Sequence, residues 1–221
     1  MKAGVKAALI TAAVALVLLL VALIFVLKSP KSDPQTVASA GPSGPPVLRA
    51  NSHVLDDGGK SAVTVVEFLD FECEACGAFY PVVEDLRKKY DGKITYVVRY
   101  FPLPGHLNSK NAAAAAEAAA QQGRLEDMYR KLFETQTEWA EAKESRASVF
   151  RGYAEQLGLD MGAYDKAIAN PATAERVALD VNDGQALGVN STPTFYVAGE
   201  RLNPRTLADL ENAVQTALGE R

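Results

Sequence analysis

Residues 65–77 read VVEFLDFECEACG, and this stretch decides the interpretation of the whole chain. Its first residues continue a β-branched, mostly apolar run over Ala62–Leu69, which predicts a buried strand. Two cysteines follow directly, separated by two residues. Apolar residues at helical spacing then predict a helix over Glu74 to Tyr90. A cysteine pair between a strand and a helix favours thiol–disulfide exchange.

The two cysteines of this pair are expected to differ in environment. Cys73 falls at the predicted helix N-terminus, where free N–H groups and the helix dipole favour a thiolate. Cys76 lies one turn further along and should be less exposed. An external thiol or disulfide would react at Cys73, and Cys76 would then displace the mixed disulfide. The alternatives are a structural disulfide, two unpaired thiols, or a metal site completed by His53 and His106.

The rest of the globular part predicts a divided α/β domain. A second strand is expected over Lys93–Phe101, and residues 108–188 are almost entirely helical in pattern. A short strand over Thr194–Val197 turns back through residues 201–202. A final helix is expected from Pro204 to Leu218, with its proline in the first turn.

The N-terminal region differs from the globular part in composition. Residues 7–27 carry no charge, and as a helix they would span about 30 Å, the thickness of a bilayer core. Residues 28–46 are rich in Pro, Gly and Ser and predict a linker. The basic residues at the two ends slightly favour an N-terminus inside the cell. A small-residue motif ending at Ala40 leaves cleavage after that residue as the alternative to a retained anchor.

Charge and cysteine count exclude several protein classes. The chain of 221 residues has a formal charge of −4, with 23 basic and 27 acidic residues. Without residues 1–46, which hold four lysines and one aspartate, the remainder carries a net −7. An acidic domain argues against binding to nucleic acid. Two cysteines exclude a disulfide-rich scaffold and a four-cysteine zinc module.

The chain resembles the thioredoxin superfamily, and more closely the DsbA-type thiol–disulfide oxidoreductases of bacterial cell envelopes. The residues that carry the resemblance are the strand leading into the cysteine pair, the long helical block, and Ser191-Thr-Pro-Thr-Phe195. The anchored layout is similar to that of Gram-positive and actinobacterial envelope members. This resemblance implies an α/β thioredoxin-like fold with an inserted helical domain, preceded by a single transmembrane helix. The expected parts are a cytoplasmic N-terminus (1–6), an anchor (7–27), a linker (28–46), a thioredoxin-like domain (47–105 and 190–221) and an inserted helical domain (106–189).

The resemblance also assigns expected roles to residues near the cysteines. Pro193 falls where the family has a cis-proline. Thr192, before it, is expected to offer its backbone to an extended substrate, and its polar side chain to tune the thiolate. Glu67 falls where the family carries a buried acid below Cys76. Buried, it would have a raised pKa and pass a proton to or from that cysteine; the alternative is a Glu facing water.

The residues between and before the cysteines are expected to tune the redox potential. Strongly oxidising family members often carry a His next to the second cysteine, whereas this chain has Glu74 and Ala75 in the gap and Glu72 before Cys73. Carboxylates near a thiol oppose its ionisation. We therefore expect a potential less oxidising than the value of about −120 mV of the strongest DsbA proteins.

The resemblance implies an enzyme that forms disulfides in exported proteins, anchored in the cell membrane with its C-terminal domain outside the cytoplasm. It would need no cofactor beyond the Cys73–Cys76 disulfide and no metal, and it would act as a monomer on unfolded polypeptides. A membrane reoxidase of the DsbB or vitamin K epoxide reductase type would restore the disulfide. A reductase or isomerase, and a non-enzymatic thioredoxin-like metallochaperone, are the alternative functions.

Overall fold

The computed structural model describes residues 46–202 and 204–219. The expected anchor over residues 7–27, and all of the expected linker except Pro46, lie outside these residues. Within the described part, no helix combines the length and apolar character needed to cross a bilayer.

A five-stranded mixed sheet forms the centre of the domain, with the strand order β1-β3-β2-β4-β5. β2 runs parallel to β3, and the other neighbouring strands are antiparallel. The predicted strands are confirmed to within one residue at each end. The strands are β1 (His53–Asp56), β2 (Val63–Leu69), β3 (Ile94–Tyr100), β4 (Thr194–Val197) and β5 (Glu200–Leu202).

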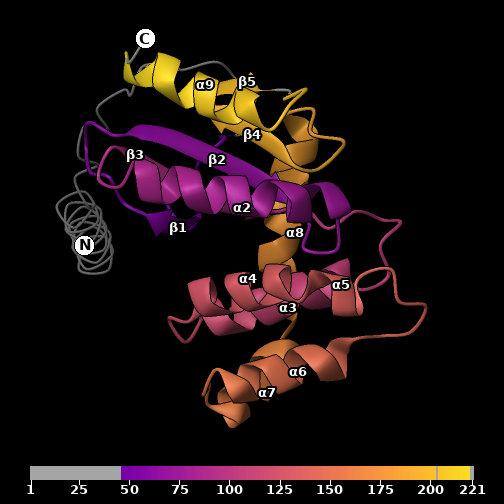
Figure 1. Cartoon of the computed structure of the whole chain (residues 1–221). Helices are drawn as coiled ribbons and strands as arrows, with labels where there is room; N and C mark the ends of the chain where they lie inside the picture. Colours follow the sequence, from indigo (N-terminus) through magenta and orange to yellow (C-terminus); the bar gives the residue numbers. More distant parts are fainter. Residues whose placement is uncertain (1–45, 203, 220–221) are drawn as a thin grey trace, which may run out of the picture. The chain divides into compact units, whose positions relative to one another are not determined.

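The helices divide into two that belong to the sheet and a block inserted between β3 and β4. In Figure 1, α3 to α7 lie together on one side of the sheet, and α8 runs from this block back to the sheet, where it crosses the strands. The helices of the sheet are α2 (Glu74–Lys89) and α9 (Ala208–Leu218). The block contains α3 (Ser109–Ala120), α4 (Leu125–Glu134), α5 (Gln136–Trp139), α6 (Ala147–Gln156), α7 (Met161–Ala169) and α8 (Pro171–Ala186).

The final helix begins later than the sequence predicts. It starts at Ala208 rather than Pro204. The Asp209 carboxylate accepts the backbone N–H groups of Arg205 at 2.7 Å and Thr206 at 3.0 Å. These bonds close a separate turn ahead of the helix, a use of Asp that local sequence patterns do not separate from a helical first turn.

Alternation along β2 places its residues on two faces of the sheet. Val65 and Leu69 join the main core, which includes side chains from α2, α9 and the helical block. Val66 and Phe68 face a second, smaller cluster that includes Val181 of α8. Glu67 shares the odd numbering of the first set, so the strand directs its side chain toward the main core.

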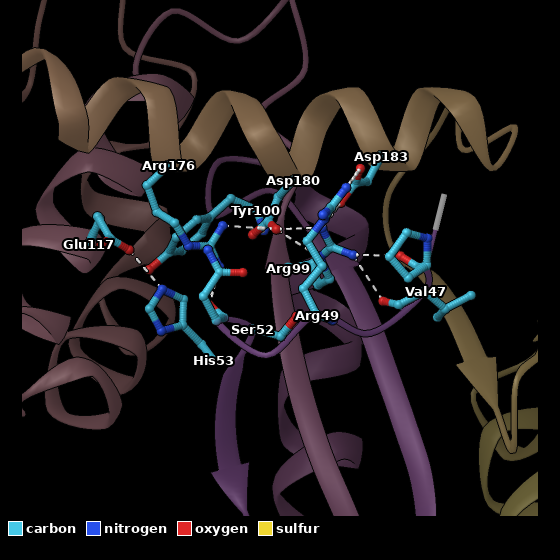
Figure 2. A network of polar contacts seen from close by, with 12 residues as sticks. Val47, Arg49, Ser52, His53, Arg99, Tyr100, Glu117, Arg176, Asp180 and Asp183 are labelled. Atoms are coloured by element: carbon cyan, nitrogen blue, oxygen red, sulfur yellow. Dashed lines mark hydrogen bonds and ion pairs between the residues drawn. The ribbon is translucent and has the colours of Figure 1, made fainter. Parts of the chain in front are cut away.

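A buried ionic network ties the start of the described chain to α8 (Figure 2). Arg99 on β3 is fully buried, and its guanidinium donates to Asp180 at 2.7 Å and also to Asp183. It further donates to the backbone carbonyls of Pro46 at 3.1 Å and Val47 at 3.0 Å. One side chain therefore joins three segments that are far apart in the sequence.

Two further arginines complete this network. Arg49 donates through two nitrogens to the Asp183 carboxylate, and Arg176 pairs with Asp180 at 2.9 Å. Asp180 also accepts the backbone N–H of Tyr100 at 3.1 Å. Buried carboxylates are tolerated because opposite charges and N–H donors surround them.

Replacing Arg99 by Ala should strongly destabilise the domain. The change leaves two buried carboxylates short of a partner, at a cost on the order of 3 kcal/mol. Arg151→Ala is the matched control, because Arg151 pairs with Asp165 at 2.8 Å on the exposed surface. Urea unfolding of the full-length protein in mild detergent measures both variants. A loss no larger for Arg99→Ala than for Arg151→Ala would contradict a stabilising role of the network.

Candidate functional site

Three chain segments meet at one edge of the sheet. Because β2 and β3 are parallel, their carboxyl ends lie together, and Phe101 N–H donates to the Leu69 carbonyl at 2.7 Å. Because β4 is antiparallel to β2, it begins at this same edge, where Thr194 pairs with Phe68. The cysteine pair after β2, the loop after β3 and residues 191–193 before β4 therefore come together.

The two cysteines occupy the positions that the sequence predicts. Cys73 is the N-cap residue of α2, and Cys76 lies within the first turn. Both are free thiols; Cys73 is 8% exposed and Cys76 is 1% exposed. The Cys73 thiol donates to the backbone carbonyl of Thr192 at 3.4 Å. The first cysteine is thus the one that an external sulfur can reach.

The surroundings of Cys73 favour its thiolate. A hydrogen bond from the Cys76 thiol is the largest influence, and the net effect lowers the pKa of Cys73 to about 5. Burial opposes this change, while Thr192 and the backbone N–H groups of Cys76 and Ala75 support it. These N–H groups are free because they belong to the first turn of a helix.

The two carboxylates beside Cys73 do not prevent this lowering of its pKa. Glu74 is exposed to solvent. Glu72 is buried, and its carboxylate accepts the backbone N–H of Asn108 at 2.6 Å. The hydrogen bonds to the Cys73 sulfur outweigh the repulsion that we expected from these two side chains.

Cys76 has the opposite electrostatic character. Burial raises the pKa of its thiol well above the usual value, and the hydrogen bond to Cys73 and the charge of Glu67 raise it further. The two sulfurs are therefore polarised: one is stable as a thiolate, and its neighbour is stable as a thiol. Such a pair suits an attacking sulfur that a second sulfur later displaces.

Glu67 lies in the interior near both cysteines. Its residue is 2% exposed, and burial raises the pKa of its carboxyl to about 7. The predicted burial is confirmed, and the alternative of a Glu facing water is wrong. The phenol of Tyr96 donates to this carboxylate and opposes the rise. The sequence gives no sign of this partner, since Tyr96 fits a packed strand position equally well.

The Thr192–Pro193 peptide bond is cis, as the resemblance implies. Thr192 is buried beside Cys73, and its side chain helps to lower the pKa of the Cys73 thiol, although its hydroxyl makes no hydrogen bond of standard geometry within the described part of the chain. The backbone carbonyl and the side chain of this residue thus both lie close to the Cys73 sulfur.

Gln136 is a site residue that the sequence does not indicate. From α5 it donates to the backbone carbonyl of Phe71 at 2.7 Å and of Cys73 at 2.9 Å. A Cβ atom added to Gly77 would lie 2.0 Å from the Gln136 side-chain oxygen, so the glycine leaves room for this contact. The inserted block therefore fixes the start of α2 directly.

The two histidines are bound to different carboxylates. His53 lies on β1 and contacts Glu117 at 2.7 Å, whereas His106 contacts Asp70 at 2.6 Å. They do not converge on the cysteines as the alternative metal site requires. Among residues 46–202 and 204–219, no three His, Cys, Asp or Glu side chains are grouped as metal ligands.

Comparison with known sequences identifies one family and several longer relatives. A family model described as Thioredoxin matches residues 58–216. The Na(+)/H(+) antiporter NhaA 3 of Salinispora tropica is 39% identical over 160 residues, which are 72% of this chain and 24% of that protein. The chain spans about a quarter of the length of the curated relatives it matches, and the antiporter name describes those longer proteins.

Solved structures share the fold over most of the chain. A thioredoxin-like oxidoreductase of Silicibacter pomeroyi is 29% identical with a TM-score of 0.64, covering 77% of this chain and 94% of that one. The α-DsbA1 protein of Wolbachia pipientis is 20% identical with a TM-score of 0.69, covering 78% and 94%. MdbA, a thiol-disulfide oxidoreductase of Corynebacterium diphtheriae, is 22% identical with a TM-score of 0.62, covering 73% and 89%. The predicted thioredoxin-like α/β fold, with a mixed sheet and helices, is confirmed.

Thr192→Val should raise the pKa of Cys73. The substitution removes the hydroxyl but keeps the carbonyl and the shape of the side chain, so we expect a rise of about half a pKa unit. The ultraviolet absorbance of the thiolate, followed against pH in the reduced protein, measures this. Thr216→Val on α9 is the control. An unchanged Cys73 titration in Thr192→Val would show that the hydroxyl does not interact with the sulfur.

Glu67→Gln should flatten the pH dependence of stability in the oxidised protein. Burial raises the folded-state pKa to about 7, from the ordinary carboxyl value of 4.5, so the folded chain holds a proton that the unfolded chain has lost. The free energy of unfolding of the wild type should therefore fall as pH rises from about 4.5 to about 7, by on the order of 3 kcal/mol. The neutral amide has no such proton. Urea unfolding at several pH values measures the difference, and parallel curves for the two proteins would contradict it.

Proposed function

The chain belongs to the thioredoxin family, and from this membership we propose that it is a thiol–disulfide oxidoreductase with Cys73 and Cys76 as its reactive pair. The observation that carries the proposal is the polarisation of the two sulfurs. Cys73 has a pKa of about 5 at a helix N-terminus, beside a buried Cys76 whose pKa is raised. A structural disulfide needs no such difference between its two thiols.

We propose that the oxidised pair accepts two electrons from a substrate dithiol in two steps. A substrate thiolate attacks the Cys73 sulfur, the Cys73–Cys76 bond breaks, and a mixed disulfide forms. Cys76 leaves and takes a proton, for which the Glu67 carboxyl is the nearby source. The second substrate thiolate then attacks its own partner sulfur, and Cys73 leaves as a thiolate. The substrate gains a disulfide and releases its two thiol protons. One of them restores the Glu67 carboxyl, which gave its own proton to Cys76, and the other goes to solvent.

The net direction proposed is disulfide formation in exported proteins. A low pKa of the attacking cysteine stabilises the reduced pair and so makes the disulfide more oxidising. A potential less oxidising than about −120 mV remains our expectation. A reductase or isomerase is the alternative direction, and a metallochaperone is the alternative without catalysis.

The proposed substrate is an extended, unfolded polypeptide. Residues before β4 present backbone groups beside Cys73, and backbone groups of this kind suit pairing with an extended segment.

We further propose that residues 7–27 anchor the protein in the cell membrane, with its N-terminus in the cytoplasm and the domain outside. The reduced pair would pass its two electrons to a quinone-linked membrane reoxidase of the DsbB or vitamin K epoxide reductase type.

Oxidative refolding of a reduced, unfolded substrate by the oxidised full-length protein tests the activity. We expect disulfides to form faster than with glutathione alone, and Cys73→Ser to abolish the acceleration. Reduced Cys76→Ser, incubated with a disulfide-bonded peptide, should accumulate a mixed disulfide because the second sulfur is missing. A wild-type rate equal to the glutathione background would refute the proposal. Zinc or copper retained by that inactive protein, and lost in Cys73→Ser, would instead favour the metallochaperone.

A further inference from the structure

Asp70 connects the cysteine pair to the loop that follows β3. It is buried, and its backbone carbonyl accepts the N–H of Cys73 at 3.1 Å. One carboxylate oxygen accepts the N–H of Glu72 at 2.9 Å. The other accepts the N–H of Leu103 at 2.8 Å and contacts His106 Nδ1 at 2.6 Å. This residue thus fixes His106 relative to the reactive sulfur.

His106 is surrounded by groups that carry or can carry negative charge. Its side chain is 26% exposed, while Asp70 and Glu72 in the β2–α2 connection are buried. Burial by itself would lower the pKa of His106, but the hydrogen bond and charge of Asp70 raise it. The charges of Cys73 and Glu72 raise it further, so the net change is upward. Asp70, which contacts both the imidazole and the backbone of Cys73, thus holds the ring within electrostatic range of the Cys73 sulfur.

We propose that His106, held by Asp70, is a positioning residue that places a positive charge beside Cys73 and so favours its thiolate. The reduced pair is stabilised and the disulfide becomes a stronger oxidant. This role rests on the proposed function, because it concerns the redox equilibrium of the same cysteines. The Glu-Ala dipeptide between the cysteines carries no positive charge. In this proposal His106, in the loop after β3, supplies that charge.

Reciprocity separates this role from a purely structural one. If the thiolate raises the proton affinity of His106, then protonated His106 must stabilise the thiolate by the same free energy. Oxidation removes the thiolate charge, so His106 should titrate at lower pH in the oxidised protein. A histidine that only balances the charge of Asp70 would titrate identically in both redox states.

The first test is the NMR titration of the histidine rings in the full-length wild-type protein, reduced and then oxidised. We expect the His106 midpoint to be higher in the reduced protein. This measurement needs no substitution, so it does not depend on the folding of a variant. Identical midpoints in the two redox states would overturn the inference.

The second test uses His106→Gln, with His53→Gln as the matched control at the other histidine. Loss of the charge should raise the pKa of Cys73 and shift the glutathione redox equilibrium about three- to tenfold toward the disulfide. His106→Lys, which restores a positive charge, should recover part of this shift, and His53→Gln should leave the equilibrium unchanged. An unchanged equilibrium in His106→Gln would contradict the inference.

The refolding assay on the wild type distinguishes the two proposals. If the wild type catalyses exchange but His106 titrates at the same pH in both redox states, the oxidoreductase function stands and the role of His106 fails. If the His106 titration depends on the redox state of Cys73 but the wild type catalyses no exchange, the electrostatic contact stands and the proposed function fails.

Discussion

The site depends on one constraint, the pairing of β2 with a parallel β3 on one side and an antiparallel β4 on the other. A parallel pair brings two carboxyl ends to the same edge, and an antiparallel neighbour brings its amino end there. The cysteines, the loop of His106 and the Thr192–Pro193 bond are distant in sequence. Once these strands pair, all three lie at the same edge of the sheet. Alternation along β2 then directs the Glu67 side chain toward the core that contains Cys76, because every second residue of a strand faces the same side of the sheet.

Within that frame, the chemistry arises from unequal solvation of two similar sulfurs. Burial penalises the charged form of any thiol, and it affects Cys73 and Cys76 in the same direction. The difference comes from hydrogen-bond donors: the first sulfur faces free N–H groups of the helix start, the Cys76 thiol and Thr192, whereas the second faces the interior and the Glu67 carboxyl.

Local sequence predicts what local interactions determine, and it fails where partners are distant. The strands, the helix after the cysteines and the order of exposure of the two sulfurs follow from patterns within about 15 residues. Glu67 and the cis bond at Pro193 follow from spacing together with a family resemblance. Tyr96, Gln136 and the carboxylate of Asp70 could not be assigned, because their partners lie 29 to 65 residues away along the chain. Each of these residue types also fits an ordinary packed or capping position, so nothing in its own neighbourhood distinguishes the role.

The sheet also separates two kinds of buried charge. On the face of α8, Arg99 and two aspartates neutralise each other, and no proton needs to move for the network to persist. On the opposite face, the direct partner of Glu67 among the described residues is the Tyr96 phenol, and the carboxyl keeps a pKa of about 7, so its proton can leave near neutral pH. A cation in place of Tyr96 would lower that pKa and hold the carboxylate charged beside Cys76. The choice of a neutral donor therefore keeps the acid exchangeable.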